Sequence, residues 1–442
     1  MIRDLLRSST AAAVGRLVGP AWVRLETLGR QGRRLLRRRA PPASSPLAPP
    51  LPATNRLREL LALYRLEGRY GLGGRPVAWA THGAPVELLR AQGFYVVLPE
   101  HEGARCGVRR GGGTLARLAE QEGFAPEVCS SARLDLGALV GGSPRGAIPR
   151  PDVLVACTNG CNTVLYWFRE LARRTGAPLF VLETPFVRGQ VRHHARLYVR
   201  DQLQGLAERL AGIGGRRLDP DRLSEVLHHS REASAGWRRA LEAARARPAP
   251  WEAADMFALL APLVVLRGEP ATARGYQQLG AALEARSRAG RGAVPTERLR
   301  LLWDGPPIWF RLRHLSRFLA ARQVALVGAT ATAVWAEAAA LLDPDRPWLS
   351  LADVLLQVHL AADLRTRHQR LATLARDLAA DGVIFHADRS CKPSSIGQAE
   401  LASLLGAEGL RGLLLEADHA DERGYVDEEI ERQLLDFLET CG

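Results

Sequence analysis

Residues 152–182 read DVLVACTNGCNTVLYWFRELARRTGAPLFVL, and this stretch decides the fold class. Two short apolar runs, Asp152–Ala156 and Pro178–Leu182, flank a segment with helical spacing of apolar side chains, Asn162–Thr175, which Gly176 follows. A strand, a helix and a second strand in this order form the unit that joins two parallel strands. The stretch therefore predicts a parallel sheet that is covered by helices.

Further apolar runs of about five residues extend this pattern in both directions and predict the remaining strands. They are Pro76–Ala80, Phe94–Leu98, Leu299–Trp303, Val324–Gly328, Gly382–His386 and Leu413–Glu416. Between Gly189 and about Gly290 no strand signal is present and helical periodicity dominates, whereas the glycine-rich stretch Gly103–Gly113 is predicted to be a loop. We therefore predict an α/β fold with two Rossmann- or flavodoxin-like parallel-sheet domains that face a cleft, with a helical insertion between them.

Composition and charge set the predicted domain boundaries. The chain has 442 residues, of which 47% are hydrophobic and 24% charged, an ordinary globular balance. Its formal charge is +13, but residues 1–40 alone contain ten arginines and only two acidic residues. We predict a basic arm and proline-rich linker at residues 1–55, a first α/β domain at 56–188, a helical subdomain at 189–295 and a second α/β domain at 296–442.

The basic arm leaves two interpretations open. It is either a solvated helix or disordered segment, or it contacts a membrane surface or nucleic acid, although no specific nucleic-acid partner is expected. No uncharged apolar run in the chain reaches the ~18 residues that a membrane span needs, and the arm lacks the apolar core of a secretory signal. A cytoplasmic protein is predicted, and its six cysteines are expected to be reduced.

Polar, cysteine-containing stretches directly follow two of the predicted strands. CTNGC follows Ala156, and ADRSC follows His386. Ligands of open parallel sheets bind at the carboxyl ends of the strands, so Cys157, Cys161 and Cys391 lie where chemistry is expected. Thiolates select zinc or iron–sulfur clusters, but the spacing alone leaves buried, inert cysteines as an alternative.

Four segments resemble the core subunits of the 2-hydroxyacyl-CoA dehydratase and benzoyl-CoA reductase family. They are Val155–Phe186, Leu301–Trp309 (LLWDGPPIW), Gly382–Gln398 (GVIFHADRSCKPSSIGQ) and Leu413–Gly424 (LLLEADHADERG), the last with an acidic residue, Asp418, after the strand. RSCKP followed by SIGQ is the most specific element, and the resemblance covers about residues 56–438.

The resemblance implies a [4Fe-4S] cluster that is held by three cysteines, one from each motif. Cys129 in VCSSAR, Cys161 in TNGCNT and Cys391 in RSCKP match the expected ligands. Cys157 is expected to be a neighbour of the cluster, and Cys106 and Cys441 are expected to have no ligand role. Structural cysteines remain the alternative for each position.

The resemblance also implies candidate groups around the cluster. Asn162, Ser390 and Lys392 are candidate residues beside it, with helix capping or surface exposure as the alternative. His82, which follows the first predicted strand, is a candidate catalytic proton donor, and an exposed loop histidine is its alternative. His386 is a possible neighbour of the third cysteine motif. Arg133 or Arg389 could meet the phosphates of CoA.

In the family, an ATP-dependent iron–sulfur activator delivers one low-potential electron, and a CoA thioester reacts through a ketyl-type radical by dehydration or by reduction of an aromatic ring. The resemblance thus implies a lyase or oxidoreductase subunit of anaerobic metabolism that acts on an acyl-CoA or aromatic-CoA. Its partners would be the activator and a paralogous second subunit, in a heterodimer or heterotetramer. No GxxxxGK[ST] motif is present, so the ATP site must belong to the activator. The alternatives are a non-catalytic cluster-carrying or electron-relay subunit, and an α/β binding protein without a cluster.

Overall fold

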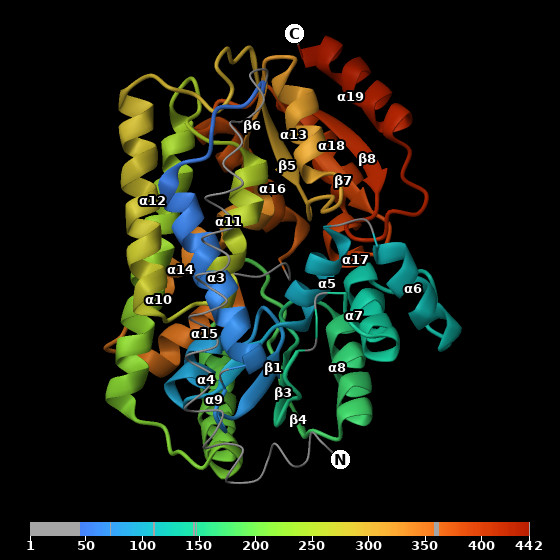
Figure 1. Ribbon diagram of the computed structural model, residues 1–442. Helices are drawn as coiled ribbons and strands as arrows, with labels where there is room; N and C mark the ends of the chain where they lie inside the picture. Colours follow the sequence, from blue (N-terminus) through green and yellow to red (C-terminus); the bar gives the residue numbers. More distant parts are fainter. Residues whose placement is uncertain are drawn as a thin grey trace.

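The computed structural model describes residues 45–70, 72–108, 111–144, 146, 148–357 and 362–441. Most of the predicted basic arm, residues 1–44, lies outside the described residues. The described part contains two four-stranded sheets, and every strand pair in them is parallel. Figure 1 shows the first sheet low in the centre and the second above it and to the right. The prediction of an α/β fold with two parallel-sheet domains is confirmed, and all eight predicted strands are present.

The first sheet has the strand order β2-β1-β3-β4. Its strands are β1 (Val77–Ala80), β2 (Tyr95–Val97), β3 (Val153–Cys157) and β4 (Leu179–Leu182). The helices that connect them are α4 (Val86–Ala91), α5 (Pro99–Gly107), α6 (Gly112–Gln121), α7 (Ser130–Gly141) and α8 (Asn162–Thr175). Because β1 lies between β2 and β3, the chain reverses its direction across the sheet there, and such a switch point is where open α/β sheets bind ligands.

The second sheet repeats this topology with the order β6-β5-β7-β8. Its strands are β5 (Leu299–Asp304), β6 (Val324–Ala329), β7 (Gly382–Asp388) and β8 (Arg411–Ala417). Its helices are α13 (Leu312–Ala320), α14 (Thr330–Leu341), α15 (Pro347–Gln357), α16 (Leu364–Asp377), α17 (Lys392–Ser395), α18 (Gln398–Ala407) and α19 (Asp427–Cys441). Leu301 and Trp303 pack toward α13 and α19, whereas Leu302 packs toward the opposite face, so helices cover both sides.

Long helices join the two sheets into one body. They are α3 (Pro52–Tyr70), α9 (His193–Gly214), α10 (Pro220–Glu242), the short η1 (Ala243–Arg245), α11 (Ala253–Val265) and α12 (Pro270–Arg288). In α10, buried Trp237 packs edge-on against Trp251 and Tyr276, and its indole N–H donates to the carbonyl oxygen of Thr332 at 3.0 Å. The buried core runs from the first sheet through these helices to one face of the second sheet. The domain boundaries at residues 55, 188 and 295 stay predictions.

The prediction of a glycine-rich loop at Gly103–Gly113 is wrong, because most of this stretch belongs to α5 and α6. Its glycines serve close helix packing rather than chain flexibility. A Cβ atom on Gly103 would lie 2.6 Å from the carbonyl oxygen of Ser131, and one on Gly112 would lie 2.1 Å from that of Ala420. The glycines therefore let these helices approach α7 and the segment after β8.

Smaller differences concern the second half of the chain. Strand β7 continues to Asp388, so His386 lies within the strand and not at its end. The stretch Leu351–Ala380, predicted as one helical region, holds parts of two helices, α15 and α16. Among the described residues, no helix combines the length and the apolar character needed to cross a membrane.

Candidate active site

Each of the three predicted ligand cysteines immediately precedes a helix. Cys129 is the N-cap of α7, Cys161 of α8 and Cys391 of α17, and all three are free and partly exposed. Figure 1 shows these helices near one another, between the two sheets. Backbone N–H groups at a helix start are unpaired and carry partial positive charge, so they stabilise a thiolate placed there.

Contacts of the neighbouring serines join Cys129 of the first domain to Cys391 of the second. The backbone N–H of Ser130 donates to Oγ of Ser390 at 3.1 Å, and the two hydroxyl oxygens lie 3.3 Å apart. Burial raises the pKa of Cys161 to about 11 and that of Cys391 to about 12, and the nearby charge of Cys129 raises both further. The three sulfurs are therefore electrostatic neighbours, and the buried thiols hold their protons unless a cation displaces them.

The loops after β1 and β3 are bound together at the switch point of the first sheet. The backbone N–H of Cys157 donates to Oγ1 of Thr81 at 3.1 Å. The side-chain amide of Asn159 donates to the carbonyl oxygens of Gly83 and Leu355, each at 3.1 Å. Asn159 thus ties the CTNGC loop both to the loop that carries His82 and to α15 of the second domain.

His82 is held by an acidic partner from α5. Its Nδ1 lies 2.5 Å from Oε1 of Glu100, and its backbone N–H donates to the other oxygen of the same carboxylate. Burial lowers the pKa of His82, but the charge and the hydrogen bond of Glu100 outweigh this and raise it overall. The imidazole also lies beside Trp335 of α14, with ring centroids 6.2 Å apart. His82 is therefore a partly exposed, oriented imidazole that favours its protonated form.

A buried ion pair that the sequence analysis missed lies behind the cysteines. Nδ1 of His419 is 2.6 Å from Oδ2 of Asp388, and its Nε2 is 2.8 Å from the hydroxyl of Ser131. Burial disfavours charge on His419, but Asp388 holds the pKa of His419 well above its usual value, and His419 lowers the pKa of Asp388. Asp388 also accepts hydrogen bonds from the backbone N–H groups of Ser390 and Cys391, at 3.0 and 3.1 Å.

The sequence did contain a signal for this pair. Asp388 ends β7, His419 follows β8, and these strands are neighbours in the second sheet. Polar residues at the carboxyl ends of adjacent parallel strands meet at one edge, so both could have been selected together with Cys391. The family motifs alone point only to Asp418, whose Oδ1 lies 3.9 Å from Nδ1 of His419.

The structure separates the other predicted residues near the cysteines. Ser390 is buried within the contacts described above, and His386 is a packed histidine whose Nδ1 lies 2.6 Å from the carbonyl oxygen of Pro306. Asn162 is exposed at the first position of α8. Lys392 is also exposed, and its Nζ donates to the carbonyl oxygen of Arg389 at 2.7 Å. Roles for Asn162 and Lys392 beside a cluster stay predictions.

The remaining cysteines have different surroundings. Cys157 is buried at the end of β3, and burial raises its pKa to about 12. Cys106 packs in a small apolar cluster with Leu115 and Ala420. Cys441 packs against Gly382, which is the first residue of β7 and so lies at the end of the second sheet opposite to Cys391.

A cavity of about 460 Å³ lies beside Cys391, and its described walls belong to the second domain. Its lining is mainly apolar and comes from α14, α16 and the segment after β5. Asp304 lies at the cavity and accepts hydrogen bonds from Thr330 and Gln398, both at 2.8 Å. Arg367 and Arg370 add positive charge to the wall. This volume and this mixture of apolar surface with a few polar groups are typical of small-molecule sites.

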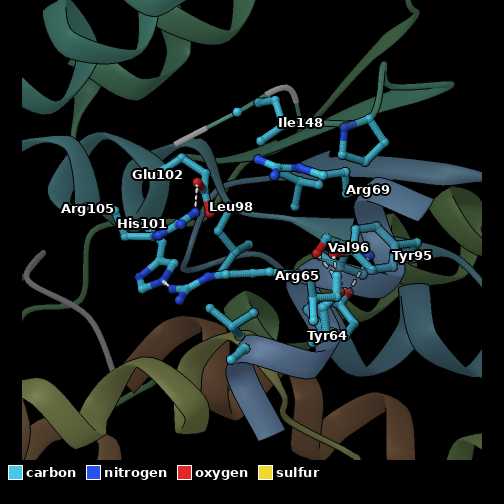
Figure 2. Close-up of a pocket in the computed structure, with 16 residues that line it drawn as sticks. Tyr64, Arg65, Arg69, Tyr95, Val96, Leu98, His101, Glu102, Arg105 and Ile148 are labelled. Atoms are coloured by element: carbon cyan, nitrogen blue, oxygen red, sulfur yellow. Dashed lines mark hydrogen bonds and ion pairs between the residues drawn. The ribbon is translucent and has the colours of Figure 1, made fainter. Parts of the chain in front are cut away.

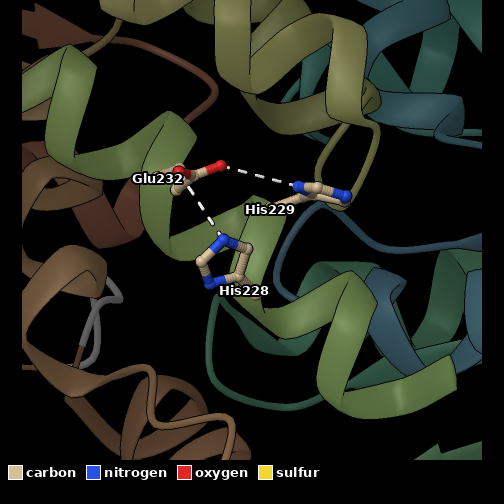
Figure 3. A group of neighbouring side chains, drawn as sticks. All are labelled: His228, His229 and Glu232. Carbon is tan, nitrogen blue, oxygen red and sulfur yellow. Dashed lines mark ion pairs between the residues drawn. The ribbon is translucent and has the colours of Figure 1, made fainter. Parts of the chain in front are cut away.

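A second group of possible metal ligands lies far from the cysteines in sequence, on the surface of α10. Figure 3 shows His228 and His229 on either side of Glu232, and each has a ring nitrogen 3.6 Å from a carboxylate oxygen of Glu232. Consecutive residues of a helix do not face each other, so the two imidazoles approach the carboxylate from different sides. We interpret this group as surface ion pairs.

Comparison with known proteins decides the family. The sequence model described as "2-hydroxyglutaryl-CoA dehydratase, D-component" matches residues 81–441, which is more than four-fifths of the chain. The chain belongs to this family. The resemblance inferred from the four motifs is therefore confirmed, and the matched residues include all three cysteines.

Several relatives of this D-component chain are subunits of enzymes that act on CoA thioesters. It is 28% identical to the (R)-2-hydroxyisocaproyl-CoA dehydratase alpha subunit of Clostridioides difficile, with 83% of this chain and 90% of the relative covered. It is 26% identical to the lactoyl-CoA dehydratase alpha subunit of Anaerotignum propionicum, with the same coverage. It is also 26% identical to the second, or B-type, chain of benzoyl-CoA reductase from Thauera aromatica, with 85% and 90% covered.

These relatives agree with the enzyme class predicted from the sequence, namely a subunit of a CoA-thioester dehydratase or reductase. Each relative is named as one subunit of its enzyme, so the relatives function in complexes with other subunits.

Proposed function

We propose that this D-component chain is the [4Fe-4S]-containing subunit of a cytoplasmic enzyme that dehydrates a 2-hydroxyacyl-CoA or reduces an aromatic acyl-CoA. Its partners would be a paralogous second subunit and an ATP-dependent iron–sulfur activator. The observation that carries the proposal is the meeting of Cys129, Cys161 and Cys391, which come from distant parts of the chain and each begin a helix.

The surroundings of the three thiols fit an anionic, thiolate-bound cluster. Helix-start N–H groups and the positively charged His419 lie next to the sulfurs, and both favour negative charge there. The three ligands would be carried on three different irons, so their sulfurs need not be as close as ligands of a single ion. Bound in this way, the cluster would keep one iron open and supply one-electron chemistry to the thioester.

The chain's own residues support substrate binding and proton transfer. The apolar cavity beside Cys391 is suited to the acyl group of a thioester, with Arg367 and Arg370 on its wall. Loss of water from a 2-hydroxyacyl group breaks one C–O and one C–H bond and needs no net reductant. We assign to His82 the proton that the departing hydroxyl takes up, because Glu100 orients its ring and favours its protonated form.

Iron and sulfide analysis after purification without oxygen tests the cluster. We expect Cys391→Ser to lose most of its iron, because the thiolate next to Asp388 and Ser130 would be missing. Cys441→Ser is the matched control, since this cysteine lies at the opposite end of β7, and it should keep its iron. Equal iron contents in the two variants would refute the ligand assignment.

A spectroscopic titration separates a catalytic subunit from an electron-relay subunit. If substrate occupies the cavity beside Cys391, then addition of a 2-hydroxyacyl-CoA or aromatic acyl-CoA should change the spectrum of the cluster. An electron-relay cluster should not respond to the thioester.

A further inference from the structure

A second large cavity, of about 570 Å³, lies between the two predicted α/β domains. Its walls come from α3 and α5 of the first domain, from α11, and from the segment that runs from Trp309 into α13 of the second domain. Seven of the described residues that line it are basic or imidazole side chains, and none of them is acidic. The arginines are Arg58, Arg65, Arg105, Arg313 and Arg317.

Carboxylates reach some of these arginines only from outside the lining. Arg58 pairs with Asp255 at 3.2 Å, and Arg105 pairs with Glu102. Within the part of the chain that the structure describes, neither Arg313 nor Arg317 takes part in an ion pair, and both are exposed at the cavity. The cavity therefore has a net positive wall.

His101 reports this positive potential. Figure 2 shows Arg65, His101 and Arg105 together on the wall that this cavity shares with a smaller one of about 150 Å³. Nη2 of Arg65 lies 2.5 Å from Nε2 of His101, and arginine keeps its protons, so the imidazole nitrogen must accept. Burial and the charges of Arg65 and Arg105 lower the pKa of His101 well below its usual value.

Arginine is abundant in this chain, so its number alone would mean little. Elsewhere, exposed arginines are commonly matched by carboxylates, as Arg239 is by Glu284 at 2.9 Å. The cavity differs because its lining has no carboxylate and because three aromatic side chains, Phe257, Trp309 and Phe310, stand among the arginines. Aromatic faces and guanidinium planes bind flat rings, and guanidinium groups bind phosphates with paired hydrogen bonds. This combination is suited to a phosphorylated adenine nucleotide.

We propose that this cavity binds the 3′-phosphorylated ADP end of a CoA thioester, an inference that rests on the proposed function. The two cavities meet at one segment, because Pro306 lines the cavity beside Cys391 and Trp309 lines the basic one. Three residues span at most about 10 Å, which the long pantetheine arm of CoA can cross. Arg133 and Arg389 do not serve instead, since Arg133 is buried against Asp421 at 3.0 Å and Arg389 pairs with Glu416 at 2.7 Å.

Calorimetric titration of the full-length protein, purified without oxygen, tests this assignment with CoA, dephospho-CoA and ADP as probes. The double variant Arg313→Ala/Arg317→Ala should bind CoA at least about tenfold more weakly, since each arginine offers charge-assisted hydrogen bonds. Trp309→Leu should also weaken CoA binding. Arg288→Ala, an exposed arginine of α12 away from the cavity, is the control and should bind CoA as the wild type does.

Equal affinity of the double variant and the wild type for CoA would overturn the assignment. If ADP and dephospho-CoA bind as tightly as CoA, then the cavity is a site for a free nucleotide and the assignment to CoA fails. Iron content distinguishes this inference from the proposed function. An iron-containing double variant with unchanged CoA affinity contradicts only the nucleotide site, whereas a chain without iron that shows the expected loss contradicts only the cluster.

Discussion

His419 and Asp135 show two opposite ways in which this protein accommodates a buried titratable side chain. His419 has a carboxylate 2.6 Å away and stays charged. Asp135 of α7 has no such counter-charge, and its Oδ2 accepts only a neutral hydrogen bond, from the indole N–H of Trp167 at 3.0 Å. Burial, together with the charges of Glu102 and Glu100, raises the pKa of Asp135 to about 8. Asp135 is therefore protonated in the folded protein at neutral pH.

This shift predicts a pH dependence of stability. An aspartate in the unfolded chain has a pKa of about 3.9, so between about pH 4 and pH 8 the folded state holds one proton more than the unfolded state. The contribution of Asp135 to the free energy of unfolding therefore falls as pH rises through this window, by on the order of 1 kcal/mol per pH unit. Asp135→Asn keeps an acceptor for Trp167 but cannot ionise.

We expect the stability of Asp135→Asn relative to the wild type to increase from pH 5 to pH 7.5. Urea unfolding midpoints at both pH values measure this difference, and the other titrating groups cancel because both proteins contain them. A difference that does not change with pH would show that Asp135 is already ionised in the folded protein.

Single residues also show how far the sequence could predict the site. The three cysteines could be selected because each stands in a motif that has a family counterpart, and Ser390 was selected with them. His419 was missed because a histidine in a polar loop gives no periodic signal, and its charge depends on Asp388, 31 residues away. The basic cavity could not be predicted from a chain with so many arginines, because only the fold shows which of them lack carboxylates around them.

Among the secondary-structure elements, the strands were the most predictable. Strands of a parallel sheet that is covered on both faces are nearly all apolar, and this pattern can be read without any tertiary information. The stretch Gly103–Gly113 was mispredicted because glycine also allows close packing, and that use becomes visible only once Ser131 and Ala420 lie opposite. Elements whose glycines meet a distant backbone cannot be identified from local propensity.

The turn after β5 depends on one glycine in a different way. Gly305 has φ +100°, and a Cβ atom there would lie 3.0 Å from the carbonyl oxygen of His386 and 3.1 Å from Oγ of Ser394. We predict that Gly305→Ala destabilises the protein by ~1–3 kcal/mol and weakens thioester binding, because this turn lines the cavity beside Cys391.

Gly406 of α18 provides the matched control for this substitution. It lies in a helix, and no heavy atom lies within 4 Å of the position that its Cβ would take. Gly406→Ala should therefore stabilise the protein by ~0.5–1 kcal/mol, as expected for an exposed helical position. Denaturant unfolding measures both changes, and similar effects of the two substitutions would contradict the strained turn.

In the whole molecule, the segment after β8 docks the second domain against the first and so holds the cysteines of both together. Arg133 of α7 is buried, and its guanidinium lies 3.0 Å from Asp421, 2.7 Å from Glu120 and 3.9 Å from Asp418. Arg423 also pairs with Glu120, at 2.6 Å. This network lies next to the contacts of Ser130 and Ser131 with His419. Domain docking and the placement of Cys129 relative to Cys391 are thus coupled.

Removal of Arg133 tests this coupling. Arg133→Ala leaves the buried carboxylates of Asp418 and Asp421 without their main counter-charge, and such a loss typically costs ~3–5 kcal/mol. We expect a lower urea midpoint and, because α7 begins at Cys129, faster loss of iron to a chelator. Arg173→Ala is the control, since Arg173 is exposed and pairs with Glu170 on the same helix, where ion pairs contribute little. Domain docking would be independent of this network if both variants unfolded at the same urea concentration, and the cysteines would be placed independently of it if both retained iron equally.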